Sequence, residues 1–199
     1  MKNTKPILFN SEMTKAILNG RKVQTRRLAK VYDVDPYFVM DNVDEVIKKH
    51  SRYKKGDTLW VREPVRIIEY SPVGNYGGSW NDEDFYSYEY VTDGSICTSQ
   101  EIPERFSMIP KWIEKKQGVP NGCIKEMARI FLKVTDVRIK KLQDISLGDI
   151  HKEGFDPEKG FASPLEWWIH LWDSNVGRLD VWTKNPYVFV YEFAVEVKD

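Results

Sequence analysis

The chain has 199 residues, of which 41% are hydrophobic and 30% charged, with 30 basic side chains against 30 acidic ones. This is the composition of an ordinary globular protein with enough length for one core. Zero net charge argues against a protein that coats nucleic acid non-specifically, although it permits a local basic cleft. No apolar run approaches the ~20 residues that cross a bilayer, and no signal-peptide pattern is present. We therefore expect a cytoplasmic protein without membrane contact.

The cysteines and histidines predict neither a disulfide framework nor a metal site. The chain has two cysteines, Cys97 and Cys123, and three scattered histidines. Two cysteines are too few for a disulfide framework, and none of these side chains lies at the spacing of zinc ligands. We therefore expect a reduced protein without a metal or another cofactor.

The first predicted elements are a short buried strand and a helix. Residues 6–10 are mostly apolar, and Ser11 is a suitable N-cap for a helix with apolar residues at helical spacing as far as Ile17. Gly20 stands where a helix C-terminus favours a left-handed residue. A second helix is predicted over residues 43–49.

The middle of the chain predicts strands around an insertion. Residues 58–63 form a strand pattern that Pro64 ends, and strand-like residues continue over 65–70. Residues 71–100 place glycines among tyrosines and an acidic run. That composition predicts an insertion, folded as a loop or as an irregular hairpin.

The last third predicts two strands and two helices. Residues 128–139 alternate between apolar and polar side chains, and Ser146 caps a short helix that Gly154 closes. A capping box from Ser163 to Glu166 begins the next helix. Its predicted apolar stripe consists of Leu165, Trp168, Ile169 and Trp172. The last strand is predicted over Tyr187 to Val197, with one face formed by Phe189, Tyr191, Phe193 and Val195.

These elements predict an α+β fold with antiparallel strands and short helices. Strands this few and this separated favour a small mixed or antiparallel β-barrel with helices around its mouth. We expect a single domain over residues 1–199, with insertions at about 31–50, 71–100 and 113–127.

A cationic segment follows the first predicted helix. Five of the ten residues from Arg21 to Lys30 are lysine or arginine, and none is acidic. Concentrated positive charge beside a hydroxyl side chain, Thr25, suits phosphates, nucleobases or acyl groups. A solvated, structurally ordinary basic strand would show the same local pattern.

Several motifs resemble the ASCH domain of the PUA-like superfamily, and most closely the longer ASCH-like proteins of bacteriophages and prophages. The resemblance covers nearly the whole chain outside the three expected insertions. The motifs are Lys5 to Phe9, Gly20-Arg21-Lys22-x-x-Thr25-x-Arg27, Gly56-Asp57-x-Leu59-Trp60-Val61-Arg62-Glu63, Val134 to Arg138, Leu142 to Ser146, Leu171 to Ser174 and Asn185 to Phe193.

This resemblance implies a PUA-like barrel with a basic cleft that binds RNA, a nucleobase or a nucleoside. One small ASCH member is a bacterial amidohydrolase that removes acetyl from N4-acetylcytidine, with a proposed catalytic lysine, threonine and glutamate. Lys22 and Thr25 match the spacing of the first two, and Glu153 matches the third. The implied substrate-binding residues are Arg21, Arg26, Arg27, Trp60, Arg62, Glu63, Lys111 and Trp112. Lys111 replaces the arginine expected before Trp112 and loses a bidentate guanidinium.

The chemistry of these residues fits acyl transfer to water without a metal. The Thr25 hydroxyl needs a base, and the Lys22 amine can serve if burial or neighbouring cations lower its pKa. Glu153 could hold that amine or protonate the leaving nitrogen, and Arg27 or Arg62 could stabilise the oxyanion. A regular strand would point Lys22 and Thr25 to opposite faces, so their meeting requires an irregular backbone.

Several alternatives remain open at the level of sequence. The protein could be a non-catalytic module of phage origin that binds RNA or modified nucleic acid, or a metal-independent ribonuclease. Arg62 and Glu63 could form a surface ion pair, although Trp60 and Arg62 on one strand face could equally line the cleft. Glu153 could be a solvated residue near a helix end.

Overall fold

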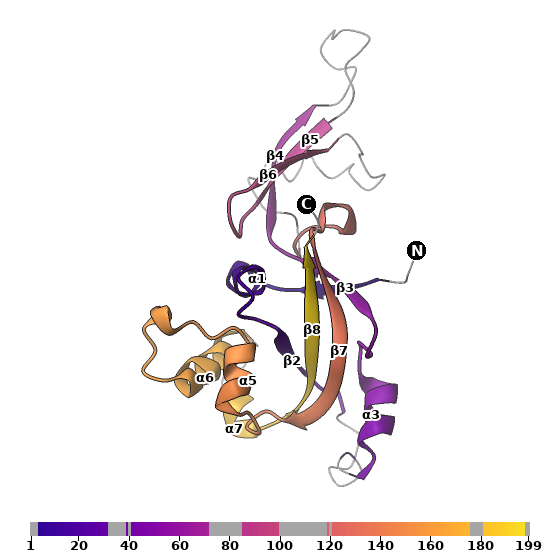
Figure 1. The fold of residues 1–199 in the computed structure, drawn as a ribbon, viewed down its shortest axis with the longest axis vertical. Coiled ribbons are helices and arrows are strands. Elements are labelled where there is room, and N and C mark those ends of the chain that lie inside the picture. The colour runs from indigo at the N-terminus through magenta and orange to yellow at the C-terminus, as the bar shows by residue number, and fades with distance from the viewer. Residues whose placement is uncertain are drawn as a thin grey trace. The chain divides into compact units, whose positions relative to one another are not determined.

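A computed structural model describes residues 4–31, 39, 41–71, 85–99, 119, 121–175 and 181–197. In these ranges the fold is mixed α+β, with two sheets and short helices (Figure 1). The α+β prediction is therefore confirmed. The chain divides into two compact units, a first with Met1–Lys5, Ala16–Leu59 and Phe131–Lys198, and a second with Pro6–Lys15, Trp60–Ile130 and Asp199.

Five strands form the larger sheet, in the order β1-β3-β7-β8-β2. The order leaves β1 and β2 at opposite ends, so no closed barrel is found among the described strands. The strands are β1 (Lys5–Leu8), β2 (Gln24–Leu28), β3 (Thr58–Arg62), β7 (Ile130–Lys141) and β8 (Tyr187–Val197).

The two longest strands carry the predicted apolar patterns. On β7 the alternating residues Ile130, Leu132 and Val134 are all buried, as their spacing predicts. On β8 consecutive residues from Val188 to Tyr191 are buried, because this part of the strand is covered on both faces. Strand β2 pairs with β8 antiparallel, and Thr25 lies opposite Tyr191.

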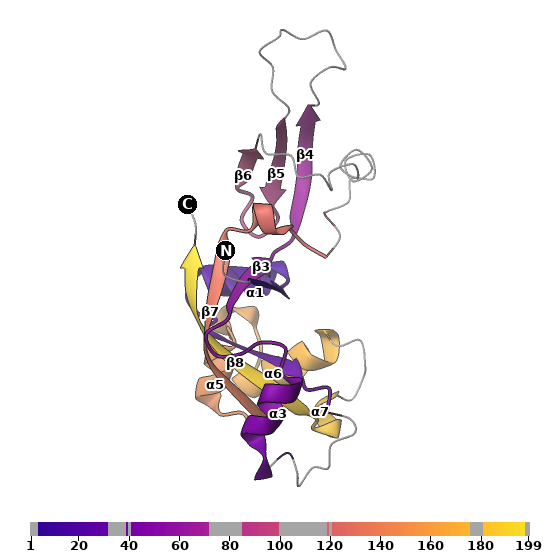
Figure 2. The same cartoon turned by 90° about the vertical axis from the view of Figure 1, so that its right-hand side faces the viewer.

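Short helices accompany the larger sheet. Figures 1 and 2 show α5, α6 and α7 close together near β2, and Figure 1 shows α3 on the other side of β7 and β8. The helices are α1 (Ser11–Leu18), α3 (Val43–His50), α5 (Leu147–Lys152), α6 (Pro164–Asn175) and α7 (Val181–Lys184), with 3-10 turns η2 (Lys125–Met127) and η3 (Pro157–Lys159).

The helix caps differ from the prediction at one position. Asn10, not Ser11, caps α1, because its side chain accepts a hydrogen bond from the Met13 N–H at 2.8 Å. Ser146 and Ser163 cap α5 and α6 as predicted, accepting from the N–H groups three residues later at 3.1 Å.

The apolar stripe of α6 is also shifted from the predicted one. Trp168 and Trp172 are buried as expected, but Leu165 is 42% exposed. Trp167 is buried instead, in contact with the ring of Phe155.

The smaller sheet consists of β4 (Val65–Ser71), β5 (Phe85–Tyr90) and β6 (Ile96–Ser99), all antiparallel. Of the two alternatives for residues 71–100, the hairpin is confirmed by β5 and β6. The alternating tyrosines Tyr86, Tyr88 and Tyr90 are buried, and the Tyr90 hydroxyl donates to the Met127 carbonyl at 2.6 Å. These tyrosines therefore belong to the core of the second unit.

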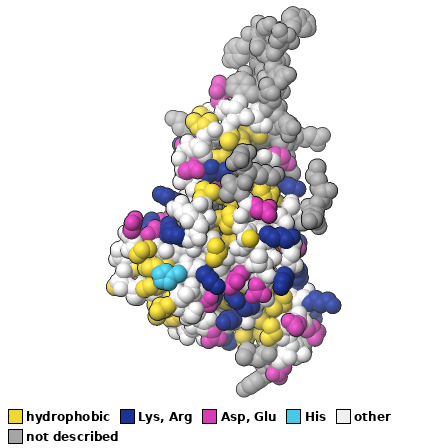
Figure 3. Space-filling model, viewed as in Figure 1, with side chains coloured by type: hydrophobic (Ala, Val, Ile, Leu, Met, Phe, Trp, Pro, Cys, Tyr) yellow, Lys and Arg dark blue, Asp and Glu magenta, His cyan; other side chains and the backbone are white. Residues whose placement is uncertain are grey.

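Charges of both signs are interspersed on the face of the protein that Figure 3 shows. In the face shown by Figure 3, basic and acidic side chains alternate without a large area of one sign. None of the helices in the described ranges is long and apolar enough to cross a membrane.

Candidate functional site

Glu153 follows the last turn of α5 and is the centre of a buried polar network. It is only 2% exposed, so the alternative of a solvated residue is wrong. Its Oε2 accepts from Lys22 Nζ at 3.0 Å, and its Oε1 accepts from Arg26 Nη1 at 2.9 Å and from Gln24 Nε2 at 3.4 Å. Two cations and an amide, all from one short segment, thus converge on one carboxylate.

Lys22 is held at both its backbone and its amine. Its N–H donates to the Ala16 carbonyl at 2.9 Å, and its Nζ donates to the Glu153 carbonyl at 2.8 Å. Gly154, with φ of +100°, allows this close approach, since a Cβ there would lie 3.1 Å from the Lys22 Cβ. Burial lowers the pKa of Lys22, Glu153 partly offsets that effect, and Arg27 and Arg26 lower the pKa further.

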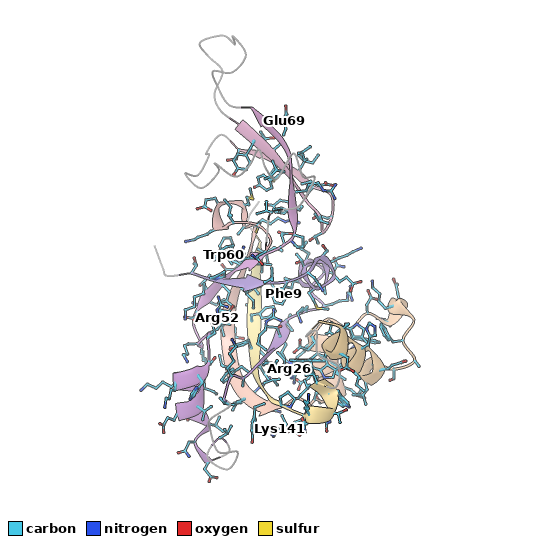
Figure 4. All side chains as sticks on the ribbon, turned by 180° about the vertical axis from the view of Figure 1, so that it is seen from behind. Phe9, Arg26, Arg52, Trp60, Glu69 and Lys141 are labelled. Carbon is cyan, nitrogen blue, oxygen red and sulfur yellow. The ribbon has the colours of Figure 1, made fainter. Side chains whose placement is uncertain are left out.

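Arg26 connects Glu153 to a second acid. Its Nη2 lies 3.0 Å from Asp149 Oδ2, and its guanidinium lies 5.5 Å from the centre of the Trp168 ring. Figure 4 shows Arg26 where β2 faces the α5–α7 helices. We call Lys22, Gln24, Arg26, Asp149 and Glu153 the Glu153 network. Its two cations balance its two carboxylates, which makes so deeply buried a set of charges tolerable.

The two faces of β2 have different surroundings. Gln24 and Arg26 both reach Glu153, so strand alternation places Thr25 and Arg27 on the opposite face. Lys22 precedes the strand and forms an isolated bridge with Glu153. The regular part of β2 therefore begins only after Lys22, but the Lys22 amine reaches Glu153 on the side of Gln24 and Arg26, opposite Thr25.

Thr25 lies in an aromatic environment. It is 2% exposed, and within the described part of the chain its hydroxyl has no hydrogen-bond partner. Its cross-strand neighbour Tyr191 packs edge-on against Tyr53, with ring centres 5.2 Å apart. The Tyr191 hydroxyl lies 3.0 Å from Ser51 Oγ, which itself donates to the Tyr53 carbonyl at 2.6 Å.

Arg27 is exposed but lies among protein atoms. The residue is exposed to solvent, yet burial lowers the pKa of its guanidinium. The charge of Glu153 raises that pKa. The coupling to Glu153, together with the effect of Arg27 on Lys22, brings Arg27 within electrostatic range of the Glu153 network.

The remaining predicted residues have separate environments. Arg21 pairs with Asp156 at 3.1 Å and donates to the Gly154 and Phe155 carbonyls, so it fastens the loop after α5. Lys111 and Trp112 lie outside the described residues.

Trp60, Arg62 and Glu63 belong to the second unit. Trp60 is 9% exposed, and the Arg62 guanidinium lies 5.9 Å from the centre of its ring, which confirms that the two share a strand face. Glu63 is fully buried, and both its oxygens accept from Arg129 at 3.0 Å. A surface pair between Arg62 and Glu63 is therefore wrong, because the partner of Glu63 is a distant arginine.

Three residues of the site were not predicted from the sequence. Asp149 and Gln24 belong to the Glu153 network, and Tyr191 faces Thr25. Gln24 could have been found, because it lies two residues from both Lys22 and Arg26, at the spacing of one strand face.

No three His, Cys, Asp or Glu side chains gather into a possible metal site within the described ranges. In the comparisons with known proteins, no family model, curated protein or solved structure matches the chain. The resemblance to the ASCH family therefore stays a prediction.

Proposed function

We propose that the protein is a PUA-like ASCH protein that binds a nucleobase, nucleoside or RNA and hydrolyses an acyl amide on a modified base. The observation that carries the proposal is the buried contact between the Lys22 amine and the Glu153 carboxylate at 3.0 Å. An amine with a lowered pKa, held by a carboxylate, is suited to general acid–base chemistry.

In the proposed reaction Thr25 is the nucleophile. The Lys22 amine, which lies against Glu153 on the side of β2 opposite Thr25, would first have to move to the Thr25 hydroxyl. As the neutral amine it then takes the hydroxyl proton, and the oxygen attacks the acyl carbon. The C–N bond breaks as the lysine ammonium returns the proton to the leaving nitrogen. Water then hydrolyses the threonine ester and releases the carboxylic acid. Glu153 holds the lysine before this movement, and Arg27 is the candidate donor to the oxyanion.

A binding module without catalysis is the second candidate. It is favoured by the full pairing of charges in the Glu153 network, since structural ion pairs also produce shifted pKa values. In that case the surface around Arg27 would bind the ligand, and the network would only support β2 beneath it.

Acetate release from N4-acetylcytidine by the purified protein tests the proposal. We expect release by the wild type and its loss in Thr25→Ala, with activity kept in the control Thr135→Ala, an exposed position on β7. An inert wild type that binds RNA would establish the binding module instead. Cleavage of unmodified RNA that is lost in Lys22→Ala would establish the ribonuclease.

A further inference from the structure

We infer that Arg27 and Arg52 form a phosphate-binding pair beside Thr25, so that a nucleotide or an RNA strand binds more tightly than a free nucleoside. The inference rests on the proposed function for the base-binding part of the site. It adds a chemical class of ligand and assigns Arg52, which the sequence motifs do not include.

Arg27 and Arg52 both interact with one pair of tyrosines, Tyr53 and Tyr191. Arg27 follows Thr25 by two residues on the same face of β2, and Thr25 lies opposite Tyr191. Tyr191 packs on Tyr53 at 5.2 Å, and the Arg52 guanidinium lies 5.4 Å from the centre of the Tyr53 ring. Arg52 thus lies beside the tyrosine pair that Thr25 faces, and Arg27 lies on the same strand face as Thr25.

Arg52 has the properties of a cation available to a ligand. It is exposed, and among the described residues it forms no ion pair with a carboxylate. It also lies close enough to Arg27 for its charge to lower the pKa of that guanidinium. Bringing like charges together is unfavourable, and a bound phosphate would relieve the repulsion.

The segment around Arg52 adds further positive charge. Lys5 Nζ lies 2.6 Å from Asp57 and 3.4 Å from the Arg52 carbonyl, and Lys54 donates to carbonyls at the end of α3. Asp57 is the only carboxylate paired with Lys5, Lys54 or Arg52 within the described ranges. These three cations and one carboxylate give the segment around Arg52 a local positive charge, although the whole chain is neutral.

A phosphate fits this arrangement better than an uncharged ligand. Guanidinium groups bind phosphate oxygens in a planar, bidentate geometry, and two of them can neutralise its charge. A nucleotide whose phosphate lies between Arg27 and Arg52 would extend its base along the face that carries Thr25. The inference therefore predicts that removing the phosphate weakens binding more than changing the base does.

The test compares cytidine, cytidine 5′-monophosphate, a short cytidine oligonucleotide and inorganic phosphate by calorimetry on the full chain. We expect the monophosphate to bind the wild type about tenfold or more tightly than cytidine. Arg52→Gln should bring the two affinities together without changing the affinity for cytidine. Arg66→Gln, at an exposed arginine on β4, is the matched control and should behave as the wild type.

The outcomes separate the inference from the proposed function. Equal affinities for cytidine and its monophosphate in the wild type would overturn the phosphate pair and leave nucleoside binding intact. Binding of phosphate alone, lost in Arg52→Gln, would support the pair while refuting the base-binding part of the proposed function. No binding of any phosphate-bearing probe would overturn the inference. Tighter binding of the oligonucleotide than of the monophosphate would identify RNA as the source of the phosphate.

Discussion

Glu153 is the residue on which the buried charges of the first unit depend. It pairs with both Lys22 and Arg26, whose side chains are 2% and 0% exposed. Removing one partner of a buried ion pair costs far more than the pair itself contributes, because the remaining charge has lost its hydration without compensation.

We therefore predict that Glu153→Gln lowers the free energy of unfolding by about 3–5 kcal/mol. Urea denaturation followed by tryptophan fluorescence measures it. Glu158→Gln, at an exposed residue of η3, is the control and should change stability by less than about 0.5 kcal/mol. Equal stability of Glu153→Gln and the wild type would mean that Lys22 and Arg26 do not depend on this carboxylate.

The backbone conformation of the turn after α5 allows Lys22 to approach Glu153. Gly154 and Gly160 both have positive φ, at +100° and +76°. An alanine Cβ at Gly154 would lie 3.0 Å from the Ala16 Cβ and 3.1 Å from the Lys22 Cβ, whereas at Gly160 nothing lies within 4 Å.

The two glycines thus separate backbone strain from steric contact. We predict that Gly160→Ala costs about 1–2 kcal/mol through backbone strain alone. Gly154→Ala should cost clearly more, because the added methyl also displaces Lys22. Parallel thermal unfolding of both variants measures the difference. Equal destabilisation would show that the turn relaxes without disturbing Lys22.

The turn between β5 and β6 depends on an ionised acid. Partial burial would raise the pKa of Asp93, but hydrogen bonds from Ser95 and Arg129 outweigh it and lower the pKa to about 2 from 3.8. A lowered pKa stabilises the fold above the unfolded value, and that contribution is lost as pH falls through the folded value.

We therefore predict that Asp93→Asn destabilises the protein above pH ~4 and that its difference from the wild type disappears as pH falls toward ~2. The effect should stay below about 1 kcal/mol, because the carboxylate is 40% exposed and screened by solvent. Paired urea denaturations across this range measure it. A difference that is independent of pH would exclude the carboxylate charge as its cause.

Local patterns predicted most of the elements. The alternation at Ile130, Leu132 and Val134 corresponds to β7, and Gly20 has the left-handed φ of +71° expected after a helix. The predictions were wrong where two nearby residues were chemically suited to the same role. Asn10 and Ser11 can both cap a helix, and either Leu165 or Trp167 can begin the apolar stripe of α6. Only packing distinguishes such pairs.

The site was less predictable, because its contacts join distant segments. Lys22 and Glu153 are 131 residues apart, and only the family resemblance suggested that they meet. Asp149 occupies the first turn of α5, where an acidic residue is already explained by the helix dipole. Nothing else in the sequence predicted the contact of Asp149 with Arg26. Likewise the strand order, with β1 and β2 at opposite ends, depends on long-range pairing that periodicity does not reveal.

At the scale of the whole molecule, the balance of 30 basic and 30 acidic residues limits how nucleic acid can bind. The interspersed charges of Figure 3 offer no wide basic surface on that face. Binding that relies on a broad surface releases many counterions and weakens steeply with salt. Binding through Arg27 and Arg52 alone involves few phosphates.

We therefore predict a shallow salt dependence for single-stranded RNA. One phosphate held by Arg27 and Arg52 should give a slope of log K against log salt of about −0.7. Arg52→Gln should bring the slope closer to zero, whereas Lys140→Gln, at an exposed residue of β7, should leave it unchanged. Fluorescence anisotropy across a salt series measures all three slopes. A wild-type slope steeper than about −4 that neither substitution changes would mean that RNA contacts a wider set of cations. In that case the local excess of charge around Arg27 and Arg52 would not determine where RNA binds.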